Sequence, residues 1–474
     1  MTTNDHVFAY AQLGYVLLVI VALIIFPGAS FFPTLLAMIG VWVVVSIVYQ
    51  QMPWRSGVGW WTLLVVATIM AIGVILNIHC FTEQVGATTE FPLLLNADSL
   101  RFYNDALYTI GSPQGIPTDL KNHGYGLLIS LLWRITGVTI VSPIVVNMFS
   151  MLLSIILCGG IAWRMLRGET GKSGRWIASC AMVMSASVCY FLNSGTLLLK
   201  EALLILAFSL IGFAMTSLVK YSPRRSANVK MMIMFAIGVI IIAFLRYNYL
   251  FMPIVGAVIL VKWQRRHLSM GAILMSICAI GWIVSILFYS TALVLDTTVN
   301  IIGGERLGDA FFSGDPQHDA YNGIVGGYLS FPWWKKVLYL PLSAAVQYLI
   351  PLPWGFTDDV HFGYTLAYAH ISYPWYAVGG LILYYIIGGA RRSPDVLRRM
   401  TFWGILMWLV PAFLFAGTVS RYALPMLPLL IPAAVYVVAK WKSFATLKRW
   451  IWCYSILLVI GLIGGYVVQK GGIL

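Results

Sequence analysis

The carboxylates of this chain fall into two stretches, and they are the first candidates for chemistry. The 474 residues contain only 16 Asp and Glu, and twelve of them lie in residues 80–124 and 292–372. Asp98 and Asp105 in the first stretch are seven residues apart, so they would share one face of a helix. A carboxylate there can accept a proton from a hydroxyl or amine, or help to bind a metal ion. Asp98 is therefore a candidate catalytic residue. The alternative interpretation is an ordinary exposed aspartate in a polar loop.

Four further ionisable residues lie at the ends of apolar runs, where charge is costly. Lys200 and Glu201 adjoin at the start of one run. Glu201 is either a helix-start acid favoured by the helix dipole or a second catalytic carboxylate. Arg246 and Arg421 are isolated cations away from the basic clusters of the chain. A guanidinium matches phosphate oxygens well, which favours phosphate binding over a snorkelling or carboxylate-paired arginine.

The remaining site predictions concern substrate contacts and metal binding. Substrate-binding candidates are Tyr103, Asp105, Lys200, Arg246, Arg421 and Tyr422. No strict ligand spacing is present, so no cofactor is predicted with certainty and a divalent metal stays open. Its candidate ligands are Asp98, Asp105, His318 and His361.

These residues must be positioned by membrane helices. Hydrophobic residues are 60% of the chain and charged residues 10%, whereas soluble proteins carry about a quarter charged residues. Backbone groups in lipid must be satisfied within the segment, so the spans are expected to be helices. We predict an all-α polytopic membrane protein, a single membrane domain over residues 1–474. The thirteen predicted spans are 7–26, 34–49, 60–79, 142–163, 176–192, 201–219, 230–246, 249–262, 269–291, 373–390, 401–417, 422–440 and 450–468.

Short basic clusters between the apolar runs predict the orientation, because cytoplasmic loops are enriched in Lys and Arg. This places the N-terminus inside and leaves residues 80–141 and 292–372 as two exterior loops. The same distribution argues against nucleic acid as a partner, despite a net charge of +14. The five clusters are Arg164, Arg167, Lys172 and Arg175; Lys220, Arg224, Arg225 and Lys230; Lys262, Arg265 and Arg266; Arg391, Arg392, Arg398 and Arg399; and Lys440, Lys442, Lys448 and Arg449.

One apolar run, residues 337–354, conflicts with this topology. If it spanned the membrane, it would invert the later loops. Pro341, Pro351 and Pro353 interrupt it, and proline breaks helices. We therefore predict a re-entrant or interfacial segment, with a genuine span as the alternative.

Several motifs in one order resemble the GT-C superfamily of membrane glycosyltransferases, which includes protein O-mannosyltransferases and the lipid A aminoarabinose transferase. They are Asp98 with Tyr103 and Ala106 after an early span, the segment Gly124-Tyr125-Gly126-Leu127-Leu128 through Gly137, the acid Glu201 opening a later span, and the segment Arg421-Tyr422-Ala423-Leu424-Pro425. The chain departs from the family in two respects. Two apparent extra spans precede Asp98, and Ser99 follows it where a paired acid is common.

The resemblance implies an enzyme that transfers a sugar from a polyprenyl-phosphate carrier to a lipid, glycan or protein acceptor, with inversion. Asp98 then matches the essential acid of the first exterior loop, and Arg421 or Arg246 matches the residues that hold the carrier phosphate. The expected location is the bacterial inner (plasma) membrane, with the active face in the periplasm. One alternative is an O-antigen or polysaccharide polymerase or ligase that uses lipid-linked oligosaccharide. A second alternative, a flippase or transporter, gains no support from internal repeats.

Overall fold

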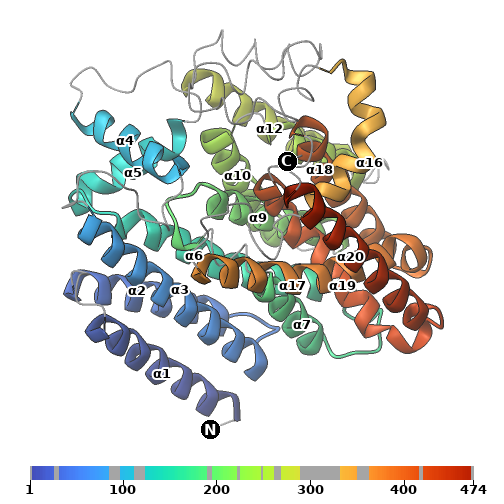
Figure 1. The fold of residues 1–474 in the computed structure, drawn as a ribbon, viewed down its shortest axis with the longest axis horizontal. Helices are drawn as coiled ribbons and strands as arrows, with labels where there is room; N and C mark the ends of the chain where they lie inside the picture. The colour runs from blue at the N-terminus through green and yellow to red at the C-terminus, as the bar shows by residue number, and fades with distance from the viewer. Residues whose placement is uncertain are drawn as a thin grey trace.

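Every regular element that the structure describes is a helix (Figure 1). This computed structural model describes residues 3–25, 31–84, 97–111, 123–188, 195–220, 225–246, 249–260, 268–288, 331–349, 362–415 and 420–470. The α-helices are α1 (Thr3–Ile25), α2 (Phe31–Gln50), α3 (Gly57–Gln84), α4 (Ala97–Gly111), α5 (His123–Thr136), α6 (Val141–Leu166), α7 (Gly174–Ser187), α9 (Glu201–Lys220), α10 (Arg225–Arg246), α11 (Phe251–Leu260), α12 (Leu268–Phe288), α16 (Trp333–Leu349), α17 (Phe362–Tyr384), α18 (Asp395–Phe415), α19 (Leu427–Ala439) and α20 (Leu447–Lys470). Short π- and 3-10 helices are η3 (Tyr385–Gly389), η4 (Ala390–Arg392), η5 (Ser420–Met426) and η6 (Trp441–Ser443).

Eight helices among the described residues are long and apolar enough to cross a membrane, which supports an all-α membrane protein. They are α1, α2, α3, α6, α9, α10, α18 and α20, and each coincides with one predicted span. The other five predicted spans also coincide with helices. Of these, α7, α11 and α19 contain 14, 10 and 13 residues. The prediction of thirteen spans therefore stays a prediction.

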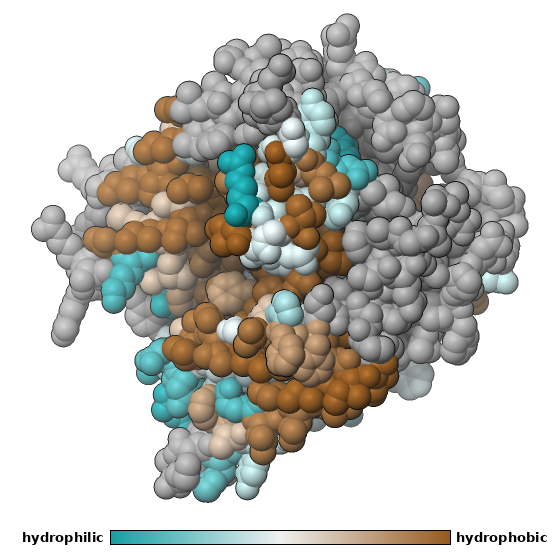
Figure 2. Space-filling model, turned by 90° about the vertical axis from the view of Figure 1, so that its left-hand side faces the viewer, coloured by the Kyte–Doolittle hydropathy of each residue, from teal (hydrophilic) through white to brown (hydrophobic). Residues whose placement is uncertain are grey.

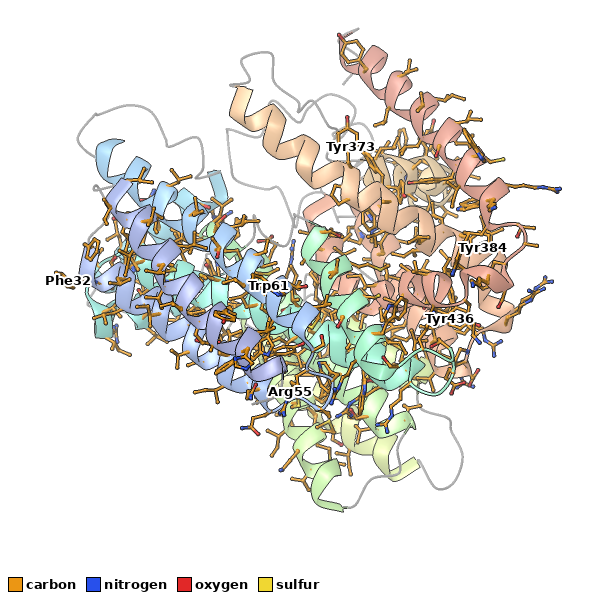
Figure 3. All side chains as sticks on the ribbon, turned by 90° about the horizontal axis from the view of Figure 1, so that it is seen from below. Phe32, Arg55, Trp61, Tyr373, Tyr384 and Tyr436 are labelled. Atoms are coloured by element: carbon orange, nitrogen blue, oxygen red, sulfur yellow. The ribbon has the colours of Figure 1, made fainter. Side chains whose placement is uncertain are left out.

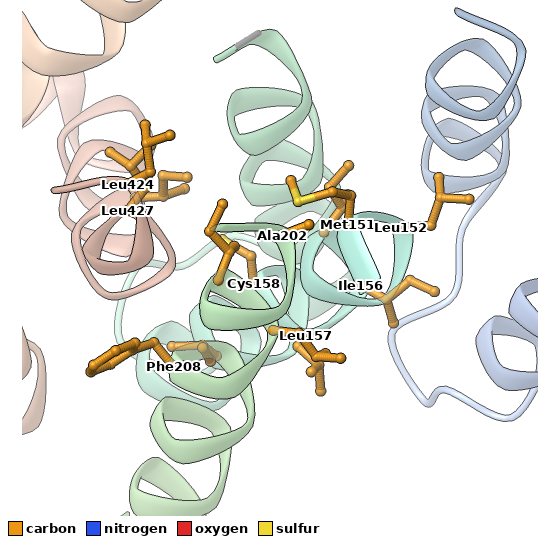
Figure 4. Close-up of a cluster of buried hydrophobic side chains, with 14 of the residues drawn as sticks. Met151, Leu152, Ile156, Leu157, Cys158, Ala202, Phe208, Leu424 and Leu427 are labelled. Carbon is orange, nitrogen blue, oxygen red and sulfur yellow. The ribbon is translucent and has the colours of Figure 1, made fainter. Parts of the chain in front are cut away.

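The core is built around α6 and α9, which run parallel. Asn147 near the start of α6 lies beside Leu197 and Leu199, just before α9, while Ile161 lies beside Gly212 further along both helices. In the apolar window of α9, 89% of the residues are buried, against 6% in α20. Figure 4 shows Cys158 of α6 among these buried apolar side chains, with Phe208 of α9 and Leu427 of α19 on one side of it, and Cys158 Sγ lies 4.0 Å from the Pro428 carbonyl oxygen of α19. Because these helices are surrounded by others, their packing fixes the position of α9.

The first three helices form a separate layer that exposes apolar side chains. Gln12 donates to Ser46 Oγ at 2.8 Å, and the Tyr15 and Trp42 rings stack with centroids 4.7 Å apart. On the opposite side of these helices large apolar residues are exposed, among them Phe32, which projects from the bundle (Figure 3). Brown hydrophobic surface accordingly covers wide areas of the face in Figure 2. This pattern is expected of helices whose outer side faces lipid.

Contacts bring several predicted cytoplasmic loops to one end of the bundle. Tyr436 Oη donates to the Arg392 carbonyl at 2.6 Å, and Arg392 Nη1 donates to the Ser443 carbonyl at 3.3 Å. Figure 3 labels Tyr384 and Tyr436 near each other at the right of the view. Ser56, just before α3, shares a 2.6 Å hydrogen bond with Ser179 of α7, which places the start of α3 there too. The cluster Lys262, Arg265 and Arg266 lies outside the described residues.

Helix α16 corrects the expectation that Pro341 would interrupt residues 337–354. The helix is continuous from Trp333 to Leu349 and includes Pro341. Its polar residues Lys336, Ser343 and Gln347 are buried. In contrast, Leu338 and other apolar residues are exposed. Gln347 Nε2 donates to the Trp408 carbonyl of α18 at 2.6 Å. Proline is tolerated in such helices because neighbouring helices satisfy freed backbone groups.

The C-terminal end of α16 is fixed by tyrosines. Tyr348 Oη lies 2.5 Å from Tyr454 Oη of α20, and Tyr454 Oη donates to the Tyr376 carbonyl of α17 at 2.6 Å. Tyr376 Oη in turn donates to the Leu349 carbonyl at 2.6 Å. Residues 350–361 lie outside the described residues, so the choice between a re-entrant and a spanning segment stays a prediction.

Candidate functional site

Three predicted ionisable residues come together at the end of the bundle opposite the basic loops. α9 and α10 are antiparallel neighbours, and Gly238 of α10 lies against Ala207 of α9. Glu201 lies six residues before Ala207 on α9, and Arg246 lies eight residues after Gly238 on α10. Because the helices are antiparallel, both residues lie at about the same height along the bundle. Lys200, Glu201 and Arg246 are 5%, 1% and 4% exposed. Burial of this kind marks them as candidates for function, because charge inside a membrane protein is costly.

Both cations lie over aromatic rings. Lys200 Nζ is 5.4 Å from the centroid of the Phe102 ring, which belongs to α4. The Arg246 guanidinium is 4.6 Å from the centroid of the Tyr249 ring, just beyond α10. A cation over a ring face is stabilised by the ring quadrupole, and more so where water is excluded. These contacts hold Lys200 against helix α4 and Arg246 against the segment that follows α10.

An asparagine fixes the segment that leads into Lys200 and Glu201. Asn147 Nδ2 lies 2.7 Å from the Leu197 carbonyl oxygen, 2.9 Å from that of Leu199 and 2.8 Å from Tyr125 Oη. The side chain is fully buried, as is most of the segment it contacts. Asn147 thus satisfies two backbone acceptors just before α9 and connects them to α5.

The Gly124-Tyr125-Gly126 motif explains how α5 approaches this site. A Cβ atom at position 124 would overlap the Phe244 carbonyl oxygen of α10, and one at position 126 would lie 3.0 Å from Asp105 Cβ of α4. The two glycines therefore allow α5 to contact α10 on one side and α4 on the other. The tyrosine between them points to Asn147, and its ring packs edge-on against Phe102 with centroids 5.0 Å apart.

The Tyr125 hydroxyl stays protonated and accepts a hydrogen bond from Asn147 Nδ2. Burial raises the pKa of Tyr125 far above its ordinary value. The hydrogen bond with Asn147 opposes this shift, and the negative charge of nearby Glu201 adds to it. Glu201 Oε2 is buried and has no hydrogen-bond partner among the described residues. The site therefore holds a buried carboxylate next to a protonated hydroxyl.

Helix α4 lies beside α5 (Figure 1) and carries Asp105, whose Cβ atom faces Gly126 of α5. Asp105 is partly buried, and its Oδ2 atom has no hydrogen-bond partner among the described residues. Burial raises the pKa of the Asp105 carboxyl above its usual range, while the positive charge of Arg101 lowers it. The predicted substrate residue Tyr103 instead packs edge-on against Trp133 of α5, with centroids 5.2 Å apart.

We expect Asp105→Asn to stabilise the protein at neutral pH. A carboxyl whose pKa is raised on folding lowers the free energy of unfolding as the pH rises from its unfolded-state pKa through its folded-state pKa. The amide removes this effect, so the melting temperature at pH 7 should rise by about 1–2 °C. Below the unfolded-state pKa the two proteins should melt alike. Thermal unfolding in detergent at both pH values measures this, and a less stable variant at pH 7 would show that the carboxylate has a favourable partner.

Other predicted site residues are placed only in part. Asp98 lies in the first turn of α4, and Arg421 and Tyr422 lie in η5, which packs against α9. The side chains of all three, and residues His318 and His361 entirely, lie outside the described residues. Among the described residues no three His, Cys, Asp or Glu side chains are grouped to bind a metal ion. The prediction of a divalent metal bound by Asp98, Asp105, His318 and His361 therefore stays a prediction.

Sequence reasoning missed the role of Asn147 and Tyr125 as contacts of the 197–199 segment. Asn147 carried a usable signal, since it is an isolated amide within a long apolar run. Such polar residues inside membrane helices face protein rather than lipid. Tyr125 had only the flanking glycines as a signal, and these predict close packing without naming the partner helices.

The chain was also compared with known proteins. No family model matches it, and no match was found among curated proteins or solved structures.

Proposed function

We propose that this protein is a membrane glycosyltransferase of the GT-C type. It transfers a sugar from a polyprenyl-phosphate carrier to a lipid, glycan or protein acceptor at the exterior face. The observation that carries this proposal is the set of buried charges Lys200, Glu201 and Arg246 at one end of an apolar helical bundle, beside the acidic helix α4.

The charges suit a phosphate that arrives within the membrane. A polyprenyl chain is apolar and lies between helices or beside them, so its phosphate meets the protein at the end of the bundle. Lys200 and Arg246 would stabilise the negative charge that develops on the departing phosphate. Fixed charges in a site that excludes water act strongly on such a transition state. Ionisable residues buried in this way are uncommon unless they bind or react.

The proposed reaction is a displacement at the anomeric carbon. The acceptor oxygen or nitrogen forms a bond to that carbon as the bond between the carbon and the phosphate oxygen breaks. The polyprenyl phosphate leaves with the bonding electrons, and the acceptor proton passes to a carboxylate of α4. Asp98 is the proposed base, and Glu201 orients Lys200 and Arg246 or accepts the proton in its place.

Asp98→Asn is expected to lower sugar transfer at least about a hundredfold while the protein remains folded. The assay uses the full chain in vesicles with a polyprenyl-phosphate sugar and a mixture of envelope acceptors. The matched control is Asp395→Asn, an exposed acid at the opposite end that pairs with Arg398 at 2.8 Å. Full transfer by the Asp98 variant would remove the assignment of this base.

The same vesicles separate the alternative functions. A polymerase or ligase would join whole oligosaccharide units and leave the monosaccharide donor unused. A flippase would move labelled carrier across the bilayer without releasing the sugar. Transfer of one sugar, with release of polyprenyl phosphate, is the expected result.

A further inference from the structure

A continuous stripe on α20 changes from basic to aromatic to aliphatic. Lys448, Trp452, Ile456 and Ile460 follow one another at four-residue intervals, so they lie along one face of the helix. All four are exposed, and Trp452 is 74% exposed. Only 6% of the apolar window of α20 is buried, the lowest share of the eight candidate spans. The side chains of this stripe therefore point away from the rest of the described protein.

The basic end of the stripe adjoins a larger positive surface, formed by residues 391–399 and 440–449. Two hydrogen bonds join these segments and their helices: Arg392 Nη1 donates to the Ser443 carbonyl at 3.3 Å, and Tyr384 Oη lies 2.9 Å from Thr446 Oγ1. Together they contain eight basic residues and one carboxylate. That carboxylate, Asp395, pairs with Arg398 at 2.8 Å and with Arg399 at 2.9 Å. The other basic residues therefore have no acid within these segments to neutralise them.

We propose that this surface is a binding site for an anionic phospholipid. Its phosphate binds at Arg391, Lys442 and Lys448, and its acyl chains lie along the stripe from Trp452 to Ile460. The order of residues matches the order of groups in a lipid, since tryptophan favours the level between head groups and hydrocarbon. Anionic head groups attract basic side chains near the membrane surface. The site lies at the opposite end from Lys200 and Arg246, so it does not depend on the proposed transfer reaction.

Charge favours a lipid over a second copy of this chain as the occupant. Two copies related by a twofold axis along the membrane normal would place their α20 helices side by side with the same ends together. The two basic surfaces would then meet, and like charges at short range repel. An anionic phospholipid neutralises this charge and also covers the apolar face.

The test is native mass spectrometry of the full chain in a neutral detergent. The probes are phosphatidylglycerol and phosphatidylcholine with the same acyl chains. The wild-type protein is expected to retain phosphatidylglycerol in preference. Each basic residue near an anionic surface contributes about a fivefold preference, so the triple variant Arg391→Gln, Lys442→Gln, Lys448→Gln should lose about a hundredfold. Trp452→Ala should weaken retention of both lipids.

The control neutralises three cations on a neighbouring loop at the same end, in the variant Arg167→Gln, Lys172→Gln, Arg175→Gln. It should keep the preference for phosphatidylglycerol. Equal loss in both triple variants would show diffuse attraction to a positive face, and no loss in either would show no such site. A lipid-free dimer that Trp452→Ala dissociates would identify a second copy as the occupant. Each of these three results would overturn the proposal, and melting temperatures in phosphatidylcholine verify that all variants are folded.

Discussion

Glu201→Gln is expected to lower sugar transfer by about two to three orders of magnitude. Glu201 is 1% exposed, lies level with Arg246, follows Lys200 directly and acts electrostatically on Tyr125. The amide keeps the size of the side chain but removes the negative charge that accompanies the two cations. The positive charges of Lys200 and Arg246 would then hold the product phosphate more strongly. The amide also cannot accept the acceptor's proton, so no second proton acceptor remains near α4. Losses of this size are typical of acid–base or charged groups in a reacting site.

The measurement must separate chemistry from stability, because removing one member of a buried charge cluster can cost about 3–5 kcal/mol of unfolding free energy. Transfer rates are therefore taken below the melting temperature of the variant and divided by the folded fraction. Glu169→Gln serves as the control, since Glu169 is an exposed acid at the basic end. If the corrected rate of Glu201→Gln equals that of the wild type, Glu201 is only the first residue of α9.

Gly124→Ala is expected to cause the largest loss of stability, about 3 kcal/mol or more. The added methyl group would overlap the Phe244 carbonyl oxygen, which belongs to the backbone of α10 and cannot rotate away. α5 must therefore move off α10, and Tyr125 moves with it, away from Asn147. The melting temperature should fall, and amide hydrogen exchange should increase in α5 and in residues 195–200.

Gly40→Ala is the matched control for this substitution. Gly40 lies in the middle of α2, and a Cβ atom there would meet nothing within 4 Å. Alanine has the higher helix propensity, so this variant should be as stable as the wild type or slightly more so. If amide hydrogen exchange in α5 is unchanged in Gly124→Ala, the α5–α10 pair tolerates the extra volume. The close approach of α5 to α10 would then not be needed to hold the site.

Much of the fold follows from the sequence because length and apolarity alone define a spanning helix. The runs that become α1, α2, α3, α6, α9, α10, α18 and α20 are long and continuous, so their positions are predicted well. α17 begins at Phe362, whereas the predicted span begins at 373, and it continues through Pro374. In that helix, as in α16, tertiary contacts outweigh the local preference of proline.

The candidate site was predictable in its residue types but not in its contacts. Lys200, Glu201 and Arg246 stand out because charged residues are rare at the predicted exterior ends of the apolar runs. That they lie at one level depends on the antiparallel packing of α9 and α10, which the spacing of basic clusters already indicates. The contact of Asn147 with Tyr125 depends on how α5 docks, and no periodicity in a 14-residue helix encodes that docking.

The polar stripe of α16 constrains the order in which the protein assembles during synthesis. Helix α16 packs against α18, and its buried Gln347 donates to the Trp408 carbonyl of α18. When α16 leaves the ribosome, α18 has not yet been made. In lipid at that moment Gln347 would lack this carbonyl acceptor, at a cost in free energy. Stable insertion of α16 must therefore follow that of α18, so this part of the protein assembles out of the order in which it is translated.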